Sequence, residues 1–300
     1  MKKASVLVTG ASGFIGSHLL PFLLARDYQV IALTRQKNKV PNHPSLTWIN
    51  DFSELKIQYL DYVINLAGEN IGQAHWTAKR KQQLIASRVE TTTQLFAYLK
   101  RQQIVPKCII SGSAVGYYGI DDTEQWSECC TEQSRPQAIF MSELCQQWEQ
   151  AALADNTQNT KIIRLGVVFG RGGGILPQML LPIKLNAVGK IGHGRQPLVW
   201  VHIDDVLHAI EFLLTHETQA QVFNVVAPEK MNQAQFAREA SKKLKRRPFL
   251  PAPQCLFKLM LGEQSQLILN GQYVQPKALV DAGFRFRYPS LNEALRDLLP

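Results

Sequence analysis

The sequence predicts an α/β protein with a doubly wound parallel sheet and a smaller C-terminal substrate lobe. Short apolar segments alternate with helical patterns along the first half of the chain, as is typical of a parallel sheet covered by helices on both faces. A glycine-rich turn follows the first of these segments and leads directly into an apolar helix. We expect the sheet domain over residues 1–165 and the lobe over residues 166–300.

The apolar segments are the predicted strands, because they are short and rich in β-branched residues. They lie at residues 4–9, 29–33, 46–50, 62–66, 107–111 and 161–165. Helical patterns lie between them, most clearly at residues 77–101 and 141–153. After residue 166, Gly and Pro interrupt the chain at residues 170–194, as in loops. A strand near residues 222–226 would interleave the lobe with the sheet, and lobe helices are expected at residues 176–185, 206–216, 232–244 and 289–298.

Composition narrows the class of protein. At 300 residues and 45% hydrophobic, the chain can bury a full core, and no segment is typical of a membrane span or a secretory signal. The five cysteines form no Cys-x-x-Cys pair and no metal-binding spacing, which fits a reducing, cytoplasmic compartment. The net charge of +9 is dispersed apart from residues 242–247, a pattern typical of a solvated helix end. We expect a cytoplasmic protein with neither a nucleic-acid nor a membrane partner.

The glycine-rich turn covers residues 9–16, Thr-Gly-Ala-Ser-Gly-Phe-Ile-Gly. Gly10 permits a tight turn, Gly13 lets the backbone approach a pyrophosphate, and Gly16 lets the helix pack closely. Phosphates would then bind the free N–H groups at the helix N-terminus, where the helix dipole favours negative charge. The segment predicts a Rossmann-type dinucleotide site. Its other expected members are Thr9, Ser12, Phe14 and Ile15.

The end of the second strand decides between the two nicotinamide cofactors. An acid there binds a ribose 2′-hydroxyl, whereas a basic residue accommodates a 2′-phosphate. Here the strand ends in Thr34 and Arg35, which offer a hydroxyl and a planar fork of donors. Lys37 and Lys39 add positive charge nearby. The sequence therefore predicts NADP(H) rather than NAD(H).

The third strand supplies the expected adenine contacts. Asp51 and Phe52 follow it directly. The Asp51 carboxylate is placed to accept a hydrogen bond from the exocyclic amine of the adenine.

Several segments resemble the short-chain dehydrogenase/reductase superfamily in its extended form. Residues 9–16 match its cofactor turn, and residues 65–68 match the turn after the fourth strand that lines the cofactor. Residues 111–114 match the strand end that carries its catalytic serine, here Ser113. Residues 164–170 and 202–206 resemble the segments that lead through the substrate lobe. The cofactor residues expected on this basis are Leu66, Ala67, Gly68 and Arg164, although structural pairing is an alternative for the arginine.

A narrower resemblance covers nearly the whole chain. Residues 111–119, 172–177, 192–196, 200–205 and 282–289 are similar to a bacterial and organellar branch called epimerase family proteins. That branch ends in its own C-terminal domain of unassigned function. The resemblance also leaves a homodimer open, since two long helices form a dimer bundle in relatives.

One departure from the superfamily concerns the chemistry. Its members use a Tyr-x-x-x-Lys pair, in which the lysine holds the nicotinamide ribose and lowers the pKa of the tyrosine. At the expected positions this chain has Phe140 and Leu144, and no Tyr-x-x-x-Lys occurs elsewhere in it. Phe140 has no proton to transfer and Leu144 cannot polarise a neighbour. The usual acid–base pair is absent.

Four residues remain as candidates for the chemistry. Ser113 would hydrogen-bond a substrate oxygen, or simply end its strand. Glu69 follows the cofactor turn, where burial would raise its pKa into the range of a general acid or base, or it is a solvated turn residue. Tyr117 or Tyr118 would replace the missing tyrosine, with a pKa near ~10 unless a cation is close, or pack against the lobe.

The lobe contributes polar residues of its own. Arg195 and Gln196 lie in a glycine-rich loop and suit an anionic or sugar-like substrate, with ordinary loop polarity as the alternative. His202, Asp204 and Asp205 lack a further set of ligands, so we expect no metal site and favour loop or helix capping.

Two hypotheses for function follow. The first is an NADP(H)-dependent oxidoreductase or epimerase acting on a polar, sugar- or nucleotide-like substrate. The second is a non-catalytic NADP(H)-binding sensor or scaffold protein. The polar residues around Ser113 favour the first, which we prefer, and the pair Phe140 and Leu144 favours the second. Residues that would face either the site or a partner helix are His75, Trp76 and Arg88.

Overall fold

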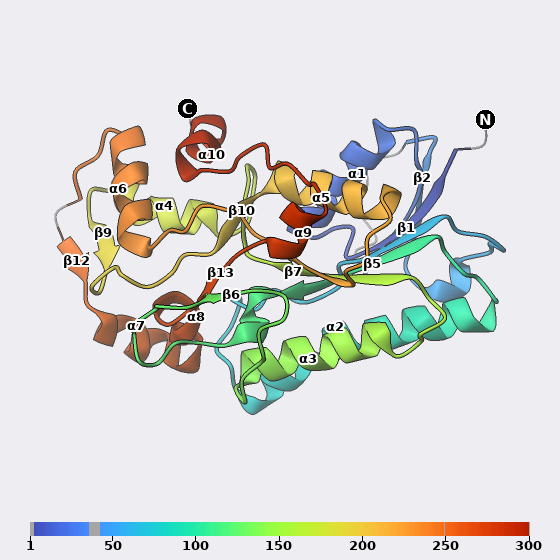
Figure 1. The fold of residues 1–300 in the computed structure, drawn as a ribbon, viewed down its shortest axis with the longest axis horizontal. Coiled ribbons are helices and arrows are strands. Elements are labelled where there is room, and N and C mark those ends of the chain that lie inside the picture. The colour runs from blue at the N-terminus through green and yellow to red at the C-terminus, as the bar shows by residue number, and fades with distance from the viewer. Residues whose placement is uncertain (1–2, 36–42, 249, 300) are drawn as a thin grey trace.

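A seven-stranded, fully parallel sheet forms the centre of the molecule (Figure 1). The computed structural model describes residues 3–35, 43–248 and 250–299. The strand order is β11-β7-β5-β4-β1-β2-β3. The strands are β1 (Ser5–Thr9), β2 (Gln29–Leu33), β3 (Leu46–Ile49), β4 (Tyr62–Asn65), β5 (Cys108–Ala114), β7 (Thr160–Leu165) and β11 (Val222–Val225).

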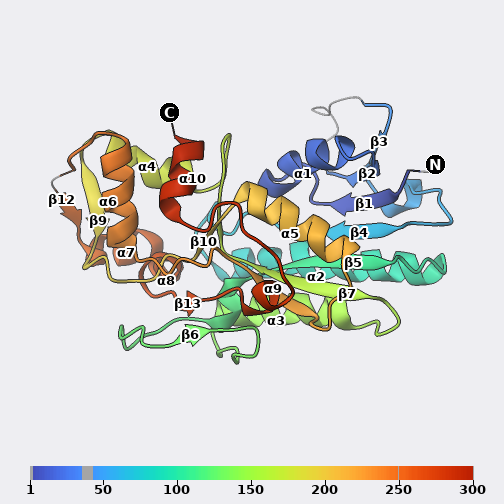
Figure 2. The ribbon, with the colours of Figure 1, turned by 45° about the horizontal axis from the view of Figure 1, so that its top comes forward.

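Helices cover both faces of this sheet, as the two views show (Figures 1 and 2). On one face, α1 (Phe14–Leu24) and α5 (Ile203–Thr215) pack against strand residues such as Val8 and Ile110. On the other, α2 (Ala78–Arg101) and α3 (Phe140–Leu153) pack against the alternate residues, such as Ile109. Strands buried on both faces are almost wholly apolar, which explains why they stand out in the sequence.

The sheet has a switch point between β1 and β4. From β1 the chain proceeds through β2 and β3 toward one edge, then returns to β4 and continues through β5, β7 and β11 toward the other. Connections from the carboxyl ends of β1 and β4 therefore run in opposite directions along the sheet. Open α/β sheets bind their ligands at such a switch point.

The bounds of these elements agree closely with those predicted from the sequence. The six predicted strands are all present, the strand near residues 222–226 is confirmed as β11, and β5 extends three residues beyond the predicted end. Helix α5 begins earlier than expected because the His202 side chain caps it, accepting a hydrogen bond from the Asp204 N–H (3.1 Å).

The lobe is built from short helices and paired short strands. Its helices are α4 (Leu176–Lys184), α6 (Gln233–Lys243), α7 (Gln254–Leu261), α8 (Gln266–Leu269), α9 (Lys277–Asp281) and α10 (Leu291–Leu298). The parallel strand pairs are β6 (Cys129–Cys130) with β13 (Tyr273–Val274), β8 (Val167–Phe169) with β10 (Trp200–His202), and β9 (Val188–Ile191) with β12 (Leu250–Ala252). Three short 3₁₀ turns are η1 (Phe52–Glu54), η2 (Val115–Tyr118) and η3 (Gly262–Ser265).

Residues from the second half of the chain also complete the core of the sheet. Val206 of α5, Phe223 of β11 and Leu279 of α9 are buried in the same cluster as Val6 of β1. Helix α9 lies beside α5 and the sheet, whereas α6 and α7 lie at the far end of the lobe (Figure 2). Within the described ranges, no helix combines the length and apolarity needed to cross a membrane.

Candidate functional site

The turn after β1 requires glycine at two positions. Gly10 has φ +67°, and a Cβ on it would lie 2.5 Å from the carbonyl oxygen of Leu66. A Cβ on Gly16 would lie 2.4 Å from the carbonyl oxygen of Gly10. The first glycine makes the turn and the third lets α1 pack onto it, as the sequence predicted.

The N-terminus of α1 is suited to bind phosphate. Gly13 is its N-cap, no side chain caps the helix, and its first turn holds no acid. A Cβ on Gly13 would meet only the carbonyl oxygen of Gly10, at 3.1 Å, somewhat closer than an ordinary van der Waals contact. The first-turn N–H groups of α1, beginning at Phe14 and Ile15, thus meet the requirements of a pyrophosphate cradle.

The ring of Phe14 is held by the glycine-rich loop after β8. Added Cβ atoms on Gly170, Gly173 and Gly174 would lie 2.8, 2.9 and 2.9 Å from that ring. Only glycines let the loop approach so closely. The loop therefore forms a wall beside the N-terminus of α1.

A polar cluster lies at the carboxyl end of β2. The Thr34 hydroxyl donates a hydrogen bond to the Ser12 hydroxyl (3.0 Å). The Arg35 side chain is 80% exposed, and its Nη1 lies 3.4 Å from Oε1 of Glu69. Lys37 and Lys39, which were expected to add charge here, lie outside the described residues.

The predicted adenine contacts have different environments. The Asp51 carboxylate accepts a hydrogen bond from the Ser53 N–H (2.7 Å). Hydrogen bonding by the Ser53 side chain, and then by its N–H, lowers the pKa of Asp51. The Phe52 ring is buried and stacks on Tyr98, with 5.8 Å between ring centroids. Its side chain is thus committed to the core, so only its main chain is left to face an adenine.

Hydrogen bonds from β1 fix the turn at residues 66–68. The buried Thr9 hydroxyl donates to the Asn65 side-chain oxygen (2.7 Å) and accepts from the Ala67 N–H (3.2 Å). Asn65 in turn donates to the hydroxyls of Thr92 and Ser111. Thr9 therefore acts on the site through this turn, and Asn65, which we did not predict, anchors it.

Glu69 differs from expectation. Its carboxylate accepts hydrogen bonds from Arg80 and, at 3.4 Å, from Arg35. The Arg80 hydrogen bond and the positive charge of both arginines lower the pKa of Glu69, against the opposing effect of burial. The expectation that burial would raise this pKa is wrong, because two arginines converge on the carboxylate. Glu69 is ionised at neutral pH.

Ser113 belongs to a buried ionic network. Its hydroxyl donates to Oε1 of Glu149 (2.6 Å). Arg164 donates to both oxygens of the same carboxylate, from Nε and Nη2, each at 2.8 Å. The three residues are 2%, 6% and 3% exposed. Arg164 thus makes the structural pairing that was the alternative to a cofactor contact. Glu149 was missed, although an acid among the buried residues of the α3 face is a sequence signal for such a pair.

The two tyrosines are tied to the same network. The Tyr118 hydroxyl donates to Asn224 (2.6 Å) and accepts from Arg164 (3.0 Å). Burial raises the pKa of Tyr118 to about 12, although Arg164 opposes this. The Tyr117 ring lies over the Arg164 guanidinium, 3.4 Å from it. A cation, Arg164, is therefore close to Tyr118, but desolvation raises the pKa of Tyr118 more than Arg164 lowers it. Tyr118 keeps its proton at neutral pH.

Apolar packing occupies the position of the missing acid–base pair. Leu144 is 1% exposed and packs with Leu84 and Trp76. The Phe140 ring contacts Trp76 edge-on, with 5.0 Å between ring centroids. The two replacements are thus part of one apolar cluster between α2 and α3.

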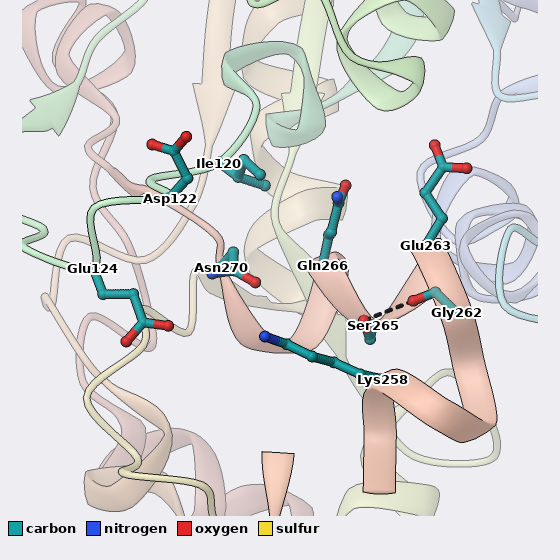
Figure 3. A pocket seen from close by; sticks show the side chains of 9 residues that line it. All are labelled: Ile120, Asp122, Glu124, Lys258, Gly262, Glu263, Ser265, Gln266 and Asn270. Atoms are coloured by element: carbon teal, nitrogen blue, oxygen red, sulfur yellow. Dashed lines mark hydrogen bonds between the residues drawn. The ribbon is translucent and has the colours of Figure 1, made fainter. Parts of the chain in front are cut away.

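Arg195 and Gln196, the candidate substrate residues of the lobe, are held by contacts with neighbouring residues. The Arg195 guanidinium lies 5.9 Å from the centre of the Trp126 ring. Gln196 is fully buried, its Nε2 donates to the Ile191 carbonyl (3.2 Å), and no described residue partners its Oε1. Neither residue lines the nearby pocket of about 490 Å³, into which Lys258 and other side chains of α7, η3 and α8 project (Figure 3).

The fold and the phosphate cradle define a Rossmann-type dinucleotide-binding protein. The chain belongs to the NAD dependent epimerase/dehydratase family, whose sequence model matches residues 6–226. The model of a domain of unknown function, DUF1731, matches residues 252–298. The resemblance inferred from the sequence is thus confirmed, including its separate C-terminal domain.

Individual proteins show the same relationship. The chain is 35% identical over 298 residues to an epimerase family protein of Staphylococcus epidermidis, and 32% identical over 301 residues to epimerase family protein YfhF of Bacillus subtilis, with 98% of each chain covered. Human epimerase family protein SDR39U1 (isoform 2), solved with NADPH, superposes with a TM-score of 0.87 at 32% identity, over 98% of both chains.

A nucleoside-diphosphate sugar epimerase of Corynebacterium glutamicum superposes with a TM-score of 0.75 at 26% identity. The match covers 98% of this chain and 57% of that one. These likenesses support a nicotinamide dinucleotide as the cofactor.

Proposed function

We propose that this protein binds NADP(H), with the 2′-phosphate held at the carboxyl end of β2. The observation that carries the proposal is the cluster of Ser12, Thr34 and Arg35 at the position where an acid would select NAD(H). The NADPH bound to human SDR39U1 supports it. The first turn of α1 would bind the pyrophosphate, and the exposed fork of Arg35 would bind the 2′-phosphate.

The affinities of Arg35 variants for NADPH and NADH test this proposal. A hydrogen bond to a charged group contributes about 1.5–3 kcal/mol, so Arg35→Asp should weaken NADPH binding about tenfold or more. NADH binding should be unchanged or tighter, because an acid at this position accepts a hydrogen bond from the ribose 2′-hydroxyl. Arg238→Met, which removes an exposed charge from the lobe, is the matched control and should alter neither affinity. An unchanged NADPH/NADH ratio in Arg35→Asp would refute the assignment.

For the reaction, we propose an oxidoreductase or epimerase acting on a polar, sugar- or nucleotide-like substrate. When bound, the nicotinamide supplies hydride exchange. Of the candidate residues, Ser113 donates its hydrogen bond to Glu149 and Tyr118 is fully buried. Glu69 is 27% exposed in its side chain and follows the cofactor turn. Because the two arginines lower its pKa, Glu69 is ionised at neutral pH and would not act as a general acid; its remaining acid–base role is that of a base weaker than an ordinary carboxylate.

The apolar cluster around Phe140 and Leu144 favours a second candidate, a non-catalytic NADP(H) sensor or scaffold. The two are separated by following NADPH absorbance with a panel of carbonyl compounds and nucleotide sugars. Turnover that survives Phe140→Ala and is lost in Glu69→Gln supports an enzyme with a relocated base. Tight NADPH binding without turnover of any compound supports the sensor.

A further inference from the structure

The far end of the lobe carries positive charge without acids. Helices α6 and α7 and strands β9 and β12 lie together at this end in both views (Figures 1 and 2). Residues 240–262, which run from the last turn of α6 to the end of α7, contain six Lys and Arg residues and no Asp or Glu. Residues 176–195, from α4 through β9, contain no acid either. Two acid-free segments therefore meet at one end of the molecule.

Contacts between these segments make one surface of them. The N–H of Arg247 donates a hydrogen bond to Oδ1 of Asn186 (3.0 Å), just after α4. Strand β12 pairs with β9, and a Cβ on Gly192, just after β9, would lie 2.4 Å from Cγ of Gln254, the first residue of α7. We call this surface, formed by the end of α4, the chain after α6, β12 and α7, the lobe tip. Its exposed cations are Lys184, Lys242, Lys245, Arg246, Arg247 and Lys258.

The charge of the lobe tip is not neutralised within the described part of the chain. None of the six exposed cations forms an ion pair with another described residue. The acids on either side of residues 240–262 are engaged elsewhere, since Oε1 of Glu239 lies 3.4 Å from Nε of Arg238 and Glu263 pairs with Lys81 of α2. The lobe tip would therefore attract an anionic partner.

Large aliphatic side chains are exposed among these cations. Leu259 of α7 is 86% exposed and Leu185, at the end of α4, is 69% exposed. Met260 of α7, Leu250 of β12 and Leu181 of α4 are each more than half exposed. Five of the nine large apolar side chains that the described residues expose thus lie on the lobe tip. Exposed apolar side chains that gather in this way mark an interaction surface.

The combination of charge and aliphatic side chains indicates the kind of partner. Leucine and methionine cannot stack on bases as the aromatic residues of nucleic-acid interfaces do. A second copy of the chain would bring like charges together, and lysine is depleted from protein–protein interfaces. An anionic lipid surface suits both features, because its headgroups attract Lys and Arg while the boundary of its acyl chains accepts Leu and Met.

We propose that the lobe tip docks this protein onto anionic lipid membranes, with Leu259 and Met260 inserted at the headgroup–acyl boundary and Arg246 and Arg247 on the headgroup phosphates. This proposal departs from the expectation of no membrane partner, which treated residues 242–247 as a solvated helix end. The exposed leucines of α4 and β12 lie beside that basic segment only in the folded protein. The proposal does not rest on the binding of NADP(H).

Co-sedimentation of the full-length protein with lipid vesicles tests the role of charge. The probes are vesicles of phosphatidylcholine alone, vesicles that also contain phosphatidylglycerol, and a duplex oligonucleotide as a second polyanion. The charge variant combines Arg246→Glu with Arg247→Glu. Its matched control combines Lys56→Glu with Arg285→Glu, which change the net charge equally at exposed positions outside the lobe tip.

A second pair of variants tests insertion. The apolar variant combines Leu259→Ser with Met260→Ser, and its control combines Val105→Ser with Val280→Ser, at exposed apolar positions elsewhere. Unchanged melting temperatures show that the variants are folded.

A natural thiol gives a direct readout of insertion. Cys255 of α7 is exposed and lies one helical turn before Leu259, on the same side of the helix. An environment-sensitive dye on Cys255, in a Cys129→Ser background that removes the half-buried thiol, should report transfer to an apolar medium when vesicles are added.

We expect binding to the vesicles with phosphatidylglycerol and none to phosphatidylcholine alone, and the binding should weaken as salt is added. Each cation near an anionic membrane contributes about fivefold in affinity, so the charge variant should lose at least about thirtyfold. The apolar variant should lose about tenfold or more. Both controls should stay within about twofold, because charges farther away than a Debye length are screened.

Several results would overturn the proposal. They are equal binding to the two kinds of vesicle, no binding to either, controls as impaired as their matched variants, and a dye on Cys255 that does not respond to vesicles. If only the charge variant loses binding, and the oligonucleotide binds as tightly as the vesicles, the lobe tip is a general polyanion surface and the proposal fails.

Discussion

Replacement of Glu149 by leucine should destabilise the protein by about 3–5 kcal/mol. The carboxylate accepts two hydrogen bonds from Arg164 and one from Ser113. The two charged side chains are only 8% and 3% exposed, so solvent cannot replace the lost partner. Glu149→Leu would leave the Arg164 guanidinium charged and buried.

The size of this effect follows from the contacts. Each hydrogen bond to a charged group contributes about 1.5–3 kcal/mol, and part of that sum is offset by the desolvation already present in the native state. Arg164→Met should cost a similar amount, because it strands the carboxylate. The double variant removes both charges, and its cost should be at least about 3 kcal/mol less than the sum of the two single costs.

Urea denaturation followed by circular dichroism measures these differences, with protein free of cofactor so that ligand binding does not add to the stability. The midpoint and the slope are both needed, because a change in slope would indicate an altered unfolded state. A cost below about 1 kcal/mol for Glu149→Leu, or a double variant equal to the sum of the two, would refute the buried pair.

Three further predictions concern the turn, a buried acid and the apolar cluster. Gly10→Ala should lower the melting temperature and weaken dinucleotide binding, because its Cβ would lie 2.5 Å from the Leu66 oxygen at φ +67°; an unchanged melting temperature would contradict this. Burial alone would raise the pKa of Asp61, but main-chain and Lys107 hydrogen bonds hold it at about 2. The ionised form then contributes about 2 kcal/mol above pH 4, which is lost as the pH falls toward 2, and Asp61→Asn should flatten that acid dependence of unfolding. Leu144→Lys, at a 1% exposed position, should cost about 3 kcal/mol or more, and a fully stable variant would show the cluster to be open to solvent.

The central sheet could be predicted from sequence because its strands are apolar on both faces and separated by clear helical periods. The elements that escaped prediction are of another kind. Strands β6 and β13 contain two residues each, too few to show any alternation, and they exist only because the fold brings Cys130 beside Val274. No local pattern encodes such a pairing.

The candidate site likewise contains features that local sequence could predict and features that it could not. The geometry of the glycine turn and the placement of Arg35 at the end of β2 were predictable, because the backbone and the strand end set them locally. The pKa of Glu69 was predicted with the wrong sign, because Arg80 reaches it from a neighbouring helix. Glu149 and Arg164 likewise meet only in the folded protein. Charge partners from separate elements decide these pKa values, and their contacts are not visible in one sequence.

The contact of Phe14 with the loop after β8 has a mechanical consequence. This ring belongs to the first residue of the helix whose N–H groups would bind the pyrophosphate, and Gly170, Gly173 and Gly174 leave it almost no clearance. A displacement of that loop, which leads into α4 of the lobe, must therefore move the ring or tilt the start of the helix. A ligand that displaced this loop would therefore also disturb the phosphate-binding end of the sheet domain.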